Sequence, residues 1–207
     1  MIAIVNYGWG NIRAIANIYK QLNVPVSIAE SEPELRNADK IILPGVGAFD
    51  SAMQSLNDSG LRPALEEEVV VARKPVLGIC VGMQMLARSS EEGKLGGLGW
   101  IDAEVRKFDT AHFPDPTHLP HMGWNDVRPR DDSDLFCELG TDARFYFLHS
   151  YYFAPAGAGD VLGETDYYGE FVSAVRSQHI FGVQFHPEKS HHWGIRLLRN
   201  FAELKSA

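Results

Sequence analysis

The sequence predicts an α/β domain with an open, mostly parallel sheet flanked by helices, and an antiparallel β insertion in its second half. The apolar run at 2–5 indicates a buried strand, and apolar side chains recur at helical spacing over 12–22. Strand-like runs follow at 24–29 and 40–43, so strands and helices alternate as in βαβ units. From residue 101 onward, short alternating segments replace this rhythm, and they predict the insertion.

The other elements are predicted from the same patterns. Helices are expected over 48–57 and 63–73, and a fourth strand follows Pro75. A helix is expected from Met83 onward. The stretch 120–125 is interpreted as a turn that holds Met122 and Trp124. Further strands are expected at 144–153, 161–165, 171–175 and 180–185.

Length and composition narrow the function. The 207 residues, 45% of them hydrophobic, predict one domain over 1–207. A net charge of −8 without any basic run argues against a nucleic-acid partner. The first residues lack the basic head of a signal peptide, and no stretch reaches the ~20 apolar residues of a membrane span. With only two cysteines, we expect a cytoplasmic protein without a membrane partner.

A candidate nucleophile lies in Gly78-Ile79-Cys80-Val81-Gly82, between a predicted strand and a predicted helix. G-x-C-x-G is the cysteine analogue of the nucleophile elbow, a strained strand-to-helix turn that exposes its central side chain. The start of a helix also favours a thiolate. A buried structural cysteine is the alternative interpretation, because free cysteine is among the most buried residue types.

Another glycine-flanked turn, Pro44-Gly45-Val46-Gly47, follows a predicted strand at the same edge of the sheet. It can point a backbone N–H into a site at that edge, or can be a plain tight turn.

The histidines His112, His118 and His121 have no familiar metal spacing, so no metal site is expected.

A candidate base follows the predicted strand at 180–185, in His186-Pro187-Glu188. A thiol nucleophile needs a base, and the base needs an orienting group. His186 and Glu188 are two residues apart on an extended chain, so their side chains point the same way. The other histidines that can serve as the base are His149, His191 and His192.

Together, these motifs resemble the class I (triad) glutamine amidotransferases in order and in spacing. The finer resemblance is to the glutaminase subunits of imidazole glycerol phosphate synthases, and it rests on four further stretches. These are Asn6-Tyr7-Gly8-x-Gly10-Asn11, Pro120-His121-Met122-Gly123-Trp124-Asn125, Tyr146-Phe147-Leu148-His149-Ser150-Tyr151 and Lys189-Ser190.

The resemblance implies a flavodoxin-like fold and a set of roles. Cys80 would attack the glutamine side-chain amide, with His186 as base and acid and Glu188 as its orienting group. A backbone N–H near Val46 or Gly47 and the backbone N–H of Val81 would form an oxyanion hole. Glutamine would be held by Gln84 and by the backbone around His149, Ser150 and Tyr151. No cofactor is implied.

The resemblance also implies a heterodimer with a (β/α)8-barrel cyclase, which would use the ammonia in histidine biosynthesis. Asn11, Trp124, Tyr146 and Lys189 would lie near that interface. An apolar, aromatic patch there suits ammonia transfer, because free ammonia would be protonated in bulk water.

Several positions depart from the common pattern, among them Trp9, Val81 and the stretch 190–194. The stretches 99–101 and 170–175 look like a paralogous group that feeds ammonia to an ATP-dependent N-acetyl sugar amidotransferase of surface-polysaccharide synthesis. A non-catalytic binding subunit and another cysteine hydrolase are further alternatives. The retained cysteine and histidine argue against the first, and Gln84 with 149–151 argues against the second.

Overall fold

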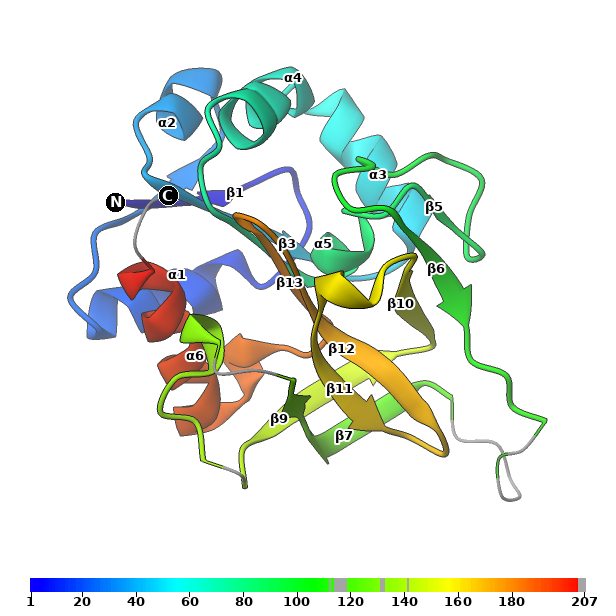
Figure 1. Ribbon diagram of the computed structural model, residues 1–207. Coiled ribbons are helices and arrows are strands. Elements are labelled where there is room, and N and C mark those ends of the chain that lie inside the picture. The colour runs from blue at the N-terminus through cyan, green and yellow to red at the C-terminus, as the bar shows by residue number, and fades with distance from the viewer. Residues whose placement is uncertain (112, 114–118, 131–132, 141, 205–207) are drawn as a thin grey trace.

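The computed structural model describes residues 1–111, 113, 119–130, 133–140 and 142–204, and its centre is one eight-stranded sheet (Figure 1). The strand order is β2-β1-β3-β4-β13-β12-β11-β8. The parallel part contains β1 (Ile2–Val5), β2 (Val26–Ala29), β3 (Lys40–Gly45), β4 (Val76–Cys80) and β13 (Ile180–Val183). The antiparallel part adds β12 (Glu170–Ser177), β11 (Val161–Asp166) and β8 (Arg128–Pro129). The predicted α/β fold is confirmed.

Helices cover both faces of the parallel part (Figure 1). On one face, α1 (Ile12–Gln21) lies against α6 (His191–Glu203). The other face carries α2 (Glu32–Arg36), α3 (Phe49–Asp58) and α4 (Arg62–Glu66), and a π-helical turn over Glu67–Val71 continues α4. α6 is not among the helices predicted from the sequence, and its buried side chains Leu197, Leu198 and Phe201 lie in the core.

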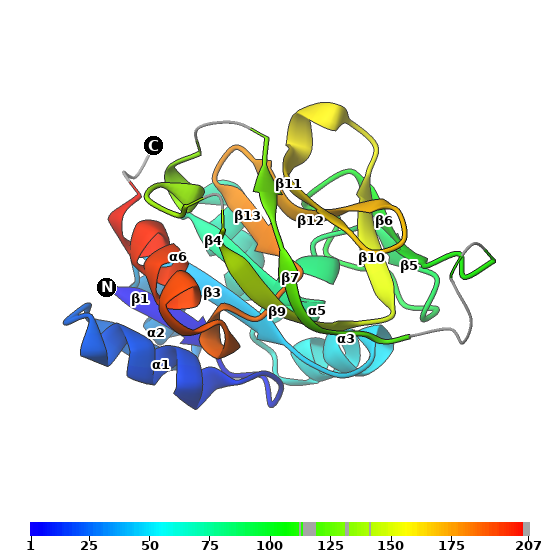
Figure 2. The ribbon, with the colours of Figure 1, turned by 90° about the horizontal axis from the view of Figure 1, so that it is seen from below.

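Two small sheets form most of the insertion. β7 (His121–Asp126) pairs antiparallel with β9 (Arg144–His149), and Figure 2 shows this ribbon beside α6. The other sheet contains β10 (Tyr151–Pro155), β6 (Ala103–Lys107) and β5 (Ser89–Ser90). The stretch 120–125 was predicted to be a turn, but most of it forms strand β7, so that prediction was wrong. Met122 and Trp124 are alternate residues on the exposed face of this strand.

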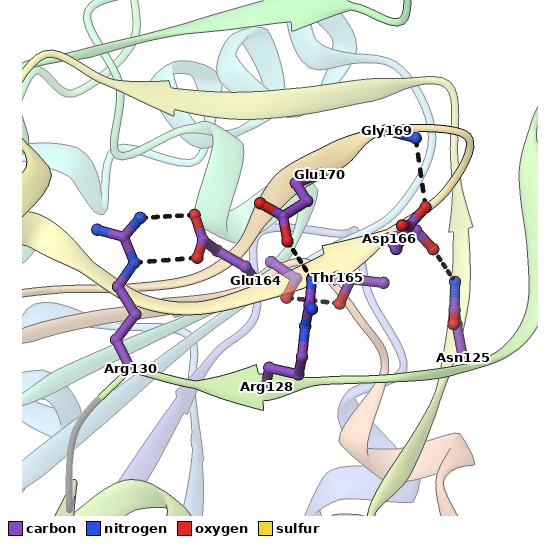
Figure 3. Close-up of polar contacts among 9 residues, drawn as sticks. Asn125, Arg128, Arg130, Glu164, Thr165, Asp166, Gly169 and Glu170 are labelled. Atoms are coloured by element: carbon purple, nitrogen blue, oxygen red, sulfur yellow. Dashed lines mark hydrogen bonds and ion pairs between the residues drawn. The ribbon is translucent and has the colours of Figure 1, made fainter.

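Arginines hold β8 at the edge of the large sheet (Figure 3). Arg130 places Nε and Nη2 at 3.0 and 2.8 Å from the two carboxylate oxygens of Glu164, and Arg128 pairs with Glu170. The Arg128–Glu170 pair is exposed and contributes at most about 1 kcal/mol, whereas the Glu164 side chain is partly buried beside Arg130. The geometric effect of the two pairs is to fix the position of the strand that leads out of the β7–β9 ribbon.

Glycines allow a close approach between the turn after β4 and strand β3. A Cβ on Gly82 would overlap the carbonyl oxygen of Leu43, and a Cβ on Gly78 would lie 2.7 Å from the carbonyl oxygen of Gly82. The helix that follows, α5, spans only Val81–Gln84, so the expectation of a helix from Met83 onward was wrong in position and length. The turn after β4 can lie this close to β3 because residue 82 has no side chain.

We predict that Gly82→Ala lowers the free energy of unfolding by about 3 kcal/mol or more, because the methyl group would push the turn off β3. Denaturant titration measures this loss. Gly159→Ala is the matched control, since a Cβ there meets no atom within 4 Å, and it should change stability by less than about 0.5 kcal/mol. Equal stabilities of the two variants would contradict the prediction.

Candidate active site

Cys80 ends β4 in a strained conformation. Its φ of 55° and ψ of −114° lie where L-residues are rare, at a cost of about 1–3 kcal/mol. The side chain is buried, and its Sγ lies 4.0 Å from the Leu148 carbonyl oxygen and 3.9 Å from the Gln184 Nε2 amide. This is the elbow that the sequence predicts, with its sulfur directed into a cleft.

His186 and Glu188 follow β13 and meet Cys80 at the same sheet edge. His186 Nδ1 donates to Glu188 Oε1 at 2.8 Å, and both side chains are at most 3% exposed. The other ring nitrogen is left for Cys80, which lines the same cleft as His186 and raises its pKa. The backbone N–H of His186 donates to the Tyr146 carbonyl at 2.8 Å, which fixes the segment against β9. Cysteine, histidine and glutamate are thus brought together as expected.

Electrostatics favour a protonated imidazole at this site. Burial lowers the pKa of His186, but the Cys80 sulfur and the Glu188 carboxylate outweigh it and raise the pKa to about 10. Burial raises the pKa of Glu188, but hydrogen bonds from His186 and Asn11 hold it below its ordinary value. α5 has only four residues, so it supplies a weaker dipole than the longer helix expected. His186 is therefore the main charged neighbour of the sulfur.

Asn11 does not cap α1 through its side chain, although it lies at the N-cap position. Its Nδ2 instead donates to Glu188 Oε1 at 2.7 Å, across 177 residues of sequence. The Glu188 oxygen therefore accepts from both His186 and Asn11. Sequence reasoning placed Asn11 near a partner and missed this contact, which only the tertiary structure creates.

The sulfur lies in a cleft of about 410 Å³. Most of the predicted site residues line it, together with Glu92, Pro120 and Leu148, which the sequence analysis did not single out. The lining residues are Asn11, Val46, Gly47, Cys80, Val81, Gln84, Glu92, Pro120, Leu148, His149, Ser150, Tyr151, His186 and Lys189. Glu188 lies behind His186, outside this lining.

Gln84 is held by the protein on one side of the cleft. Its Nε2 donates to the Tyr151 carbonyl and to Gln184 Oε1, each at 3.1 Å. Both amide hydrogens are thus used, and its Oε1 is left to accept a hydrogen bond from a ligand. Gln184 is fully buried and lies between the Gln84 side chain and the Cys80 sulfur. No sequence signal distinguished Gln184 from the other residues at the end of this strand.

Two of the predicted partner residues, Trp124 and Tyr146, lie on the outer face of the β7–β9 ribbon, and Lys189 lies beside them. Trp124 pairs across the strands with Tyr146, and Lys189 Nζ lies 5.6 Å from the Tyr146 ring centroid. The Trp124 ring stacks on His191 at a centroid distance of 5.2 Å. The same face exposes Met122, 65% accessible, and Leu148. Exposed apolar side chains clustered in this way mark an interaction surface.

Two of the predicted absences concern metals and membranes. Within the described part of the chain, no cluster of three or more His, Cys, Asp or Glu side chains is placed to hold a metal ion. His112 and His118 lie outside the described residues. None of the helices that the described residues form has the length and apolar character that a membrane span needs.

The family model for glutamine amidotransferase class-I matches residues 3–204. The chain therefore belongs to the class-I glutamine amidotransferase family. Within it, the chain is 55% identical to the imidazole glycerol phosphate synthase subunit HisH of Bdellovibrio bacteriovorus, over 99% of this chain and 100% of that one. It is 50% identical to HisH of Leptospira interrogans, again over 99% and 100%. HisH 2 of Pseudomonas aeruginosa is 45% identical, with the same coverage.

Solved structures agree on the fold. A crystal structure of a glutamine amidotransferase superposes with a TM-score of 0.75 at 20% identity, covering 98% of each chain. PurLQS from Thermotoga maritima gives a TM-score of 0.69 at 15% identity, covering 97% of this chain and 96% of that chain. At these identities the likeness concerns architecture alone.

We predict that Glu188→Gln lowers the pKa of His186 by about one unit or more, because the carboxylate stabilises the imidazolium. NMR titration of His186 measures the shift.

The raised pKa of His186 also stabilises the folded protein. This contribution to the free energy of unfolding is complete below about pH 6.5 and is lost as pH rises toward about 10, and Glu188→Gln should reduce it. Glu203→Gln, on α6 outside the cleft, should leave the titration unchanged. An unshifted His186 in Glu188→Gln would contradict the assignment.

Proposed function

We propose that this chain, as one domain over 1–207, is the glutaminase subunit of an imidazole glycerol phosphate synthase. It hydrolyses glutamine to glutamate and ammonia and passes the ammonia to a second subunit. The observation that carries the proposal is one cleft lined by the strained Cys80 elbow and by His186, with the buried Glu188 bonded to His186 from behind. Relatives that are named HisH and match over nearly their full length support the choice of synthase.

The proposed chemistry proceeds through a thioester. The Cys80 sulfur attacks the amide carbon of glutamine, and the C–N bond breaks when His186 gives its proton to the leaving ammonia. Water then attacks the thioester, His186 takes a proton from it, and the C–S bond breaks to release glutamate. Glu188 holds the imidazole so that the second ring nitrogen faces the sulfur.

Backbone N–H groups at Val46, Gly47 and Val81 are proposed to stabilise the oxyanion, at about 3 kcal/mol per donor. All three line the cleft beside Cys80. Gly47 has a φ of 80°, and a Cβ there would lie 2.7 Å from the Trp9 ring, so the turn is confined to glycine. Trp9 is itself held by a hydrogen bond from Nε1 to Ser55 at 2.7 Å. Strand β3 and α3 thus fix the turn that would supply the donors.

Glutamine is proposed to lie between Gln84 and the segment from His149 to Tyr151. The free Oε1 of Gln84 suits the amide hydrogens of the substrate, and the backbone around Ser150 suits its amino-acid end. The volume of about 410 Å³ accommodates one amino acid of this size.

The proposed partner is a (β/α)8-barrel cyclase that forms a heterodimer with this chain in the cytoplasm. Asn11, Trp124, Tyr146 and Lys189 are the proposed contact residues. Asn11 and Lys189 line the mouth of the cleft, and Trp124 and Tyr146 lie on the neighbouring apolar face. A partner seated there would close the cleft away from water, which keeps ammonia unprotonated.

A second acceptor is retained on specific observations. Relatives in Pseudomonas aeruginosa and Methanococcus maripaludis, each 45% identical, carry the name HisH 2, which indicates a second chain of this type in those organisms. The atypical His191 and Trp193 lie around Trp124 on the proposed partner face, away from the triad. Such changes would alter the choice of partner and leave the chemistry intact. The alternative partner is an ATP-dependent amidotransferase of N-acetyl sugars.

We predict that Cys80→Ser lowers glutamate release by about a thousandfold or more, since the alcohol is a far weaker nucleophile at neutral pH. A coupled glutamate assay on the purified complex measures the loss. Cys137→Ser removes the other cysteine, which is exposed outside the cleft, and should retain full activity. Glutamate release that survives Cys80→Ser would remove the thiol from the mechanism.

We predict that the tagged chain co-purifies with a (β/α)8-barrel cyclase, and that Lys189→Ala weakens the complex by about three- to tenfold. Lys20→Ala, on an exposed turn of α1, is the matched control and should leave the affinity unchanged. Calorimetry or surface plasmon resonance provides the affinities. Co-purification with an ATP-using sugar amidotransferase instead would favour the second acceptor.

A further inference from the structure

A buried pair of histidines lies at the wall of the cleft, and the proposed triad does not use it: His149 lines the cleft and His121 lies behind it. His121 on β7 and His149 on β9 are paired across the ribbon, and His121 Nδ1 lies 3.1 Å from His149 Nε2. Both residues are at most 6% exposed. The His121 ring is stacked between Phe147 and Tyr167, with centroids at 4.7 and 3.9 Å, so its orientation is restrained from both sides.

The direction of each hydrogen bond is fixed by a backbone carbonyl. His149 Nδ1 lies 2.8 Å from the Tyr151 carbonyl, which can only accept, so Nδ1 carries the hydrogen. In a neutral ring Nε2 is then an acceptor, and His121 must donate to it from its own Nδ1. His121 Nε2 in turn accepts from Asn125 Nδ2 at 3.2 Å. The other Nδ2 hydrogen of Asn125 goes to the Asp166 carbonyl at 2.8 Å (Figure 3).

Both rings are neutral at pH 7. Burial lowers the pKa of His121 to about 4. Burial, with the neighbouring His121, lowers the pKa of His149 to about 3. Neutral rings are what the donor order requires, because a second proton on either histidine would set two N–H groups against each other.

The same chain of hydrogen bonds continues to the sulfur. The Tyr151 carbonyl accepts from Gln84 Nε2 as well as from His149, and Gln84 also donates to Gln184 Oε1. Gln184 Nε2 lies 3.9 Å from Cys80 Sγ. One continuous set of buried contacts therefore links strand β7, the segment 149–151 and the nucleophile.

We propose that His121 is a positioning residue: its Nδ1–H holds the orientation of the His149 ring, and through the Tyr151 carbonyl it sets the glutamine-binding edge relative to Cys80. This inference deepens the proposed glutaminase function and rests on it. His121 lines no part of the cleft and acts only through His149.

A matched pair of substitutions isolates the donor. Asn and Leu have nearly the same size, and both remove the ring stacking on Phe147 and Tyr167. Only His121→Asn keeps an N–H at the δ position that faces His149. We expect His121→Leu to raise the KM for glutamine about tenfold with a smaller change in kcat, because a buried acceptor loses its donor. His121→Asn should stay within about threefold of the wild type. Equal KM values for the two variants would overturn the proposal.

Two controls separate this test from the proposed function. Alkylation of Cys80 by iodoacetamide needs no glutamine, and its rate should be the same in the wild type and in both variants. A rate lowered in both variants would place the effect at the triad and overturn the positioning role. A wild-type complex that releases no glutamate would instead refute the glutaminase function itself.

Nitrogen-15 NMR of the wild-type histidines tests the network without any substitution. We expect His121 and His149 to be neutral Nδ1–H tautomers at pH 7, the form less common in free histidine. A charged ring, or an Nε2–H tautomer at either residue, would overturn the proposal even if both variants fail to fold.

Discussion

The close approach of the turn after β4 to strand β3 is the constraint on which the site depends. Gly82 lies against the Leu43 carbonyl with no room for a side chain, and this contact holds Cys80 at a positive φ. The strain of about 1–3 kcal/mol is offset by the fully buried strands on either side. Because β3, β4 and β13 are parallel and adjacent, their carboxyl ends bring the Gly47 turn, the thiol and His186 to one edge.

The insertion adds a wall that the parallel sheet alone does not provide. The β7–β9 ribbon has two different faces because successive strand side chains point to opposite sides. Its inner face carries His121, Phe147 and His149 against the core. Its outer face presents Met122, Trp124 and Leu148 to solvent. One face of the ribbon thus supports the cleft, and the other face carries the surface proposed for a partner. The two faces are separated by the thickness of a single layer of strands.

Buried charge at the site is compensated by short-range partners. Glu188 is taken out of water, and such a carboxylate is costly unless it is paired. His186, at the start of η4 (Pro187–Lys189), and Asn11, at the start of α1, supply that pairing at Oε1. Oε2 is buried without a hydrogen-bond partner among the described residues. The imidazole is charged because the sulfur and the carboxylate outweigh its burial. Burial also lowers the pKa of His121 and of His149, and neither has a carboxylate partner among the described residues, so both rings are neutral. The difference from His186 therefore comes from the neighbours of each ring.

The sequence alone was sufficient for what depends on local pattern. The alternation of strands and helices predicts the sheet, and the two glycines around Cys80 predict the elbow. The contact between His186 and Glu188 was also predicted, but it forms in the 3-10 turn Pro187–Lys189 and not on the extended chain that the prediction assumed. Tertiary structure alone decided the partners of Asn11 and Gln184, the pairing of β7 with β9, and the inward turn of His121. These depend on residues that lie 18 to 177 positions apart in the chain, where neither periodicity nor composition specifies which donor meets which acceptor.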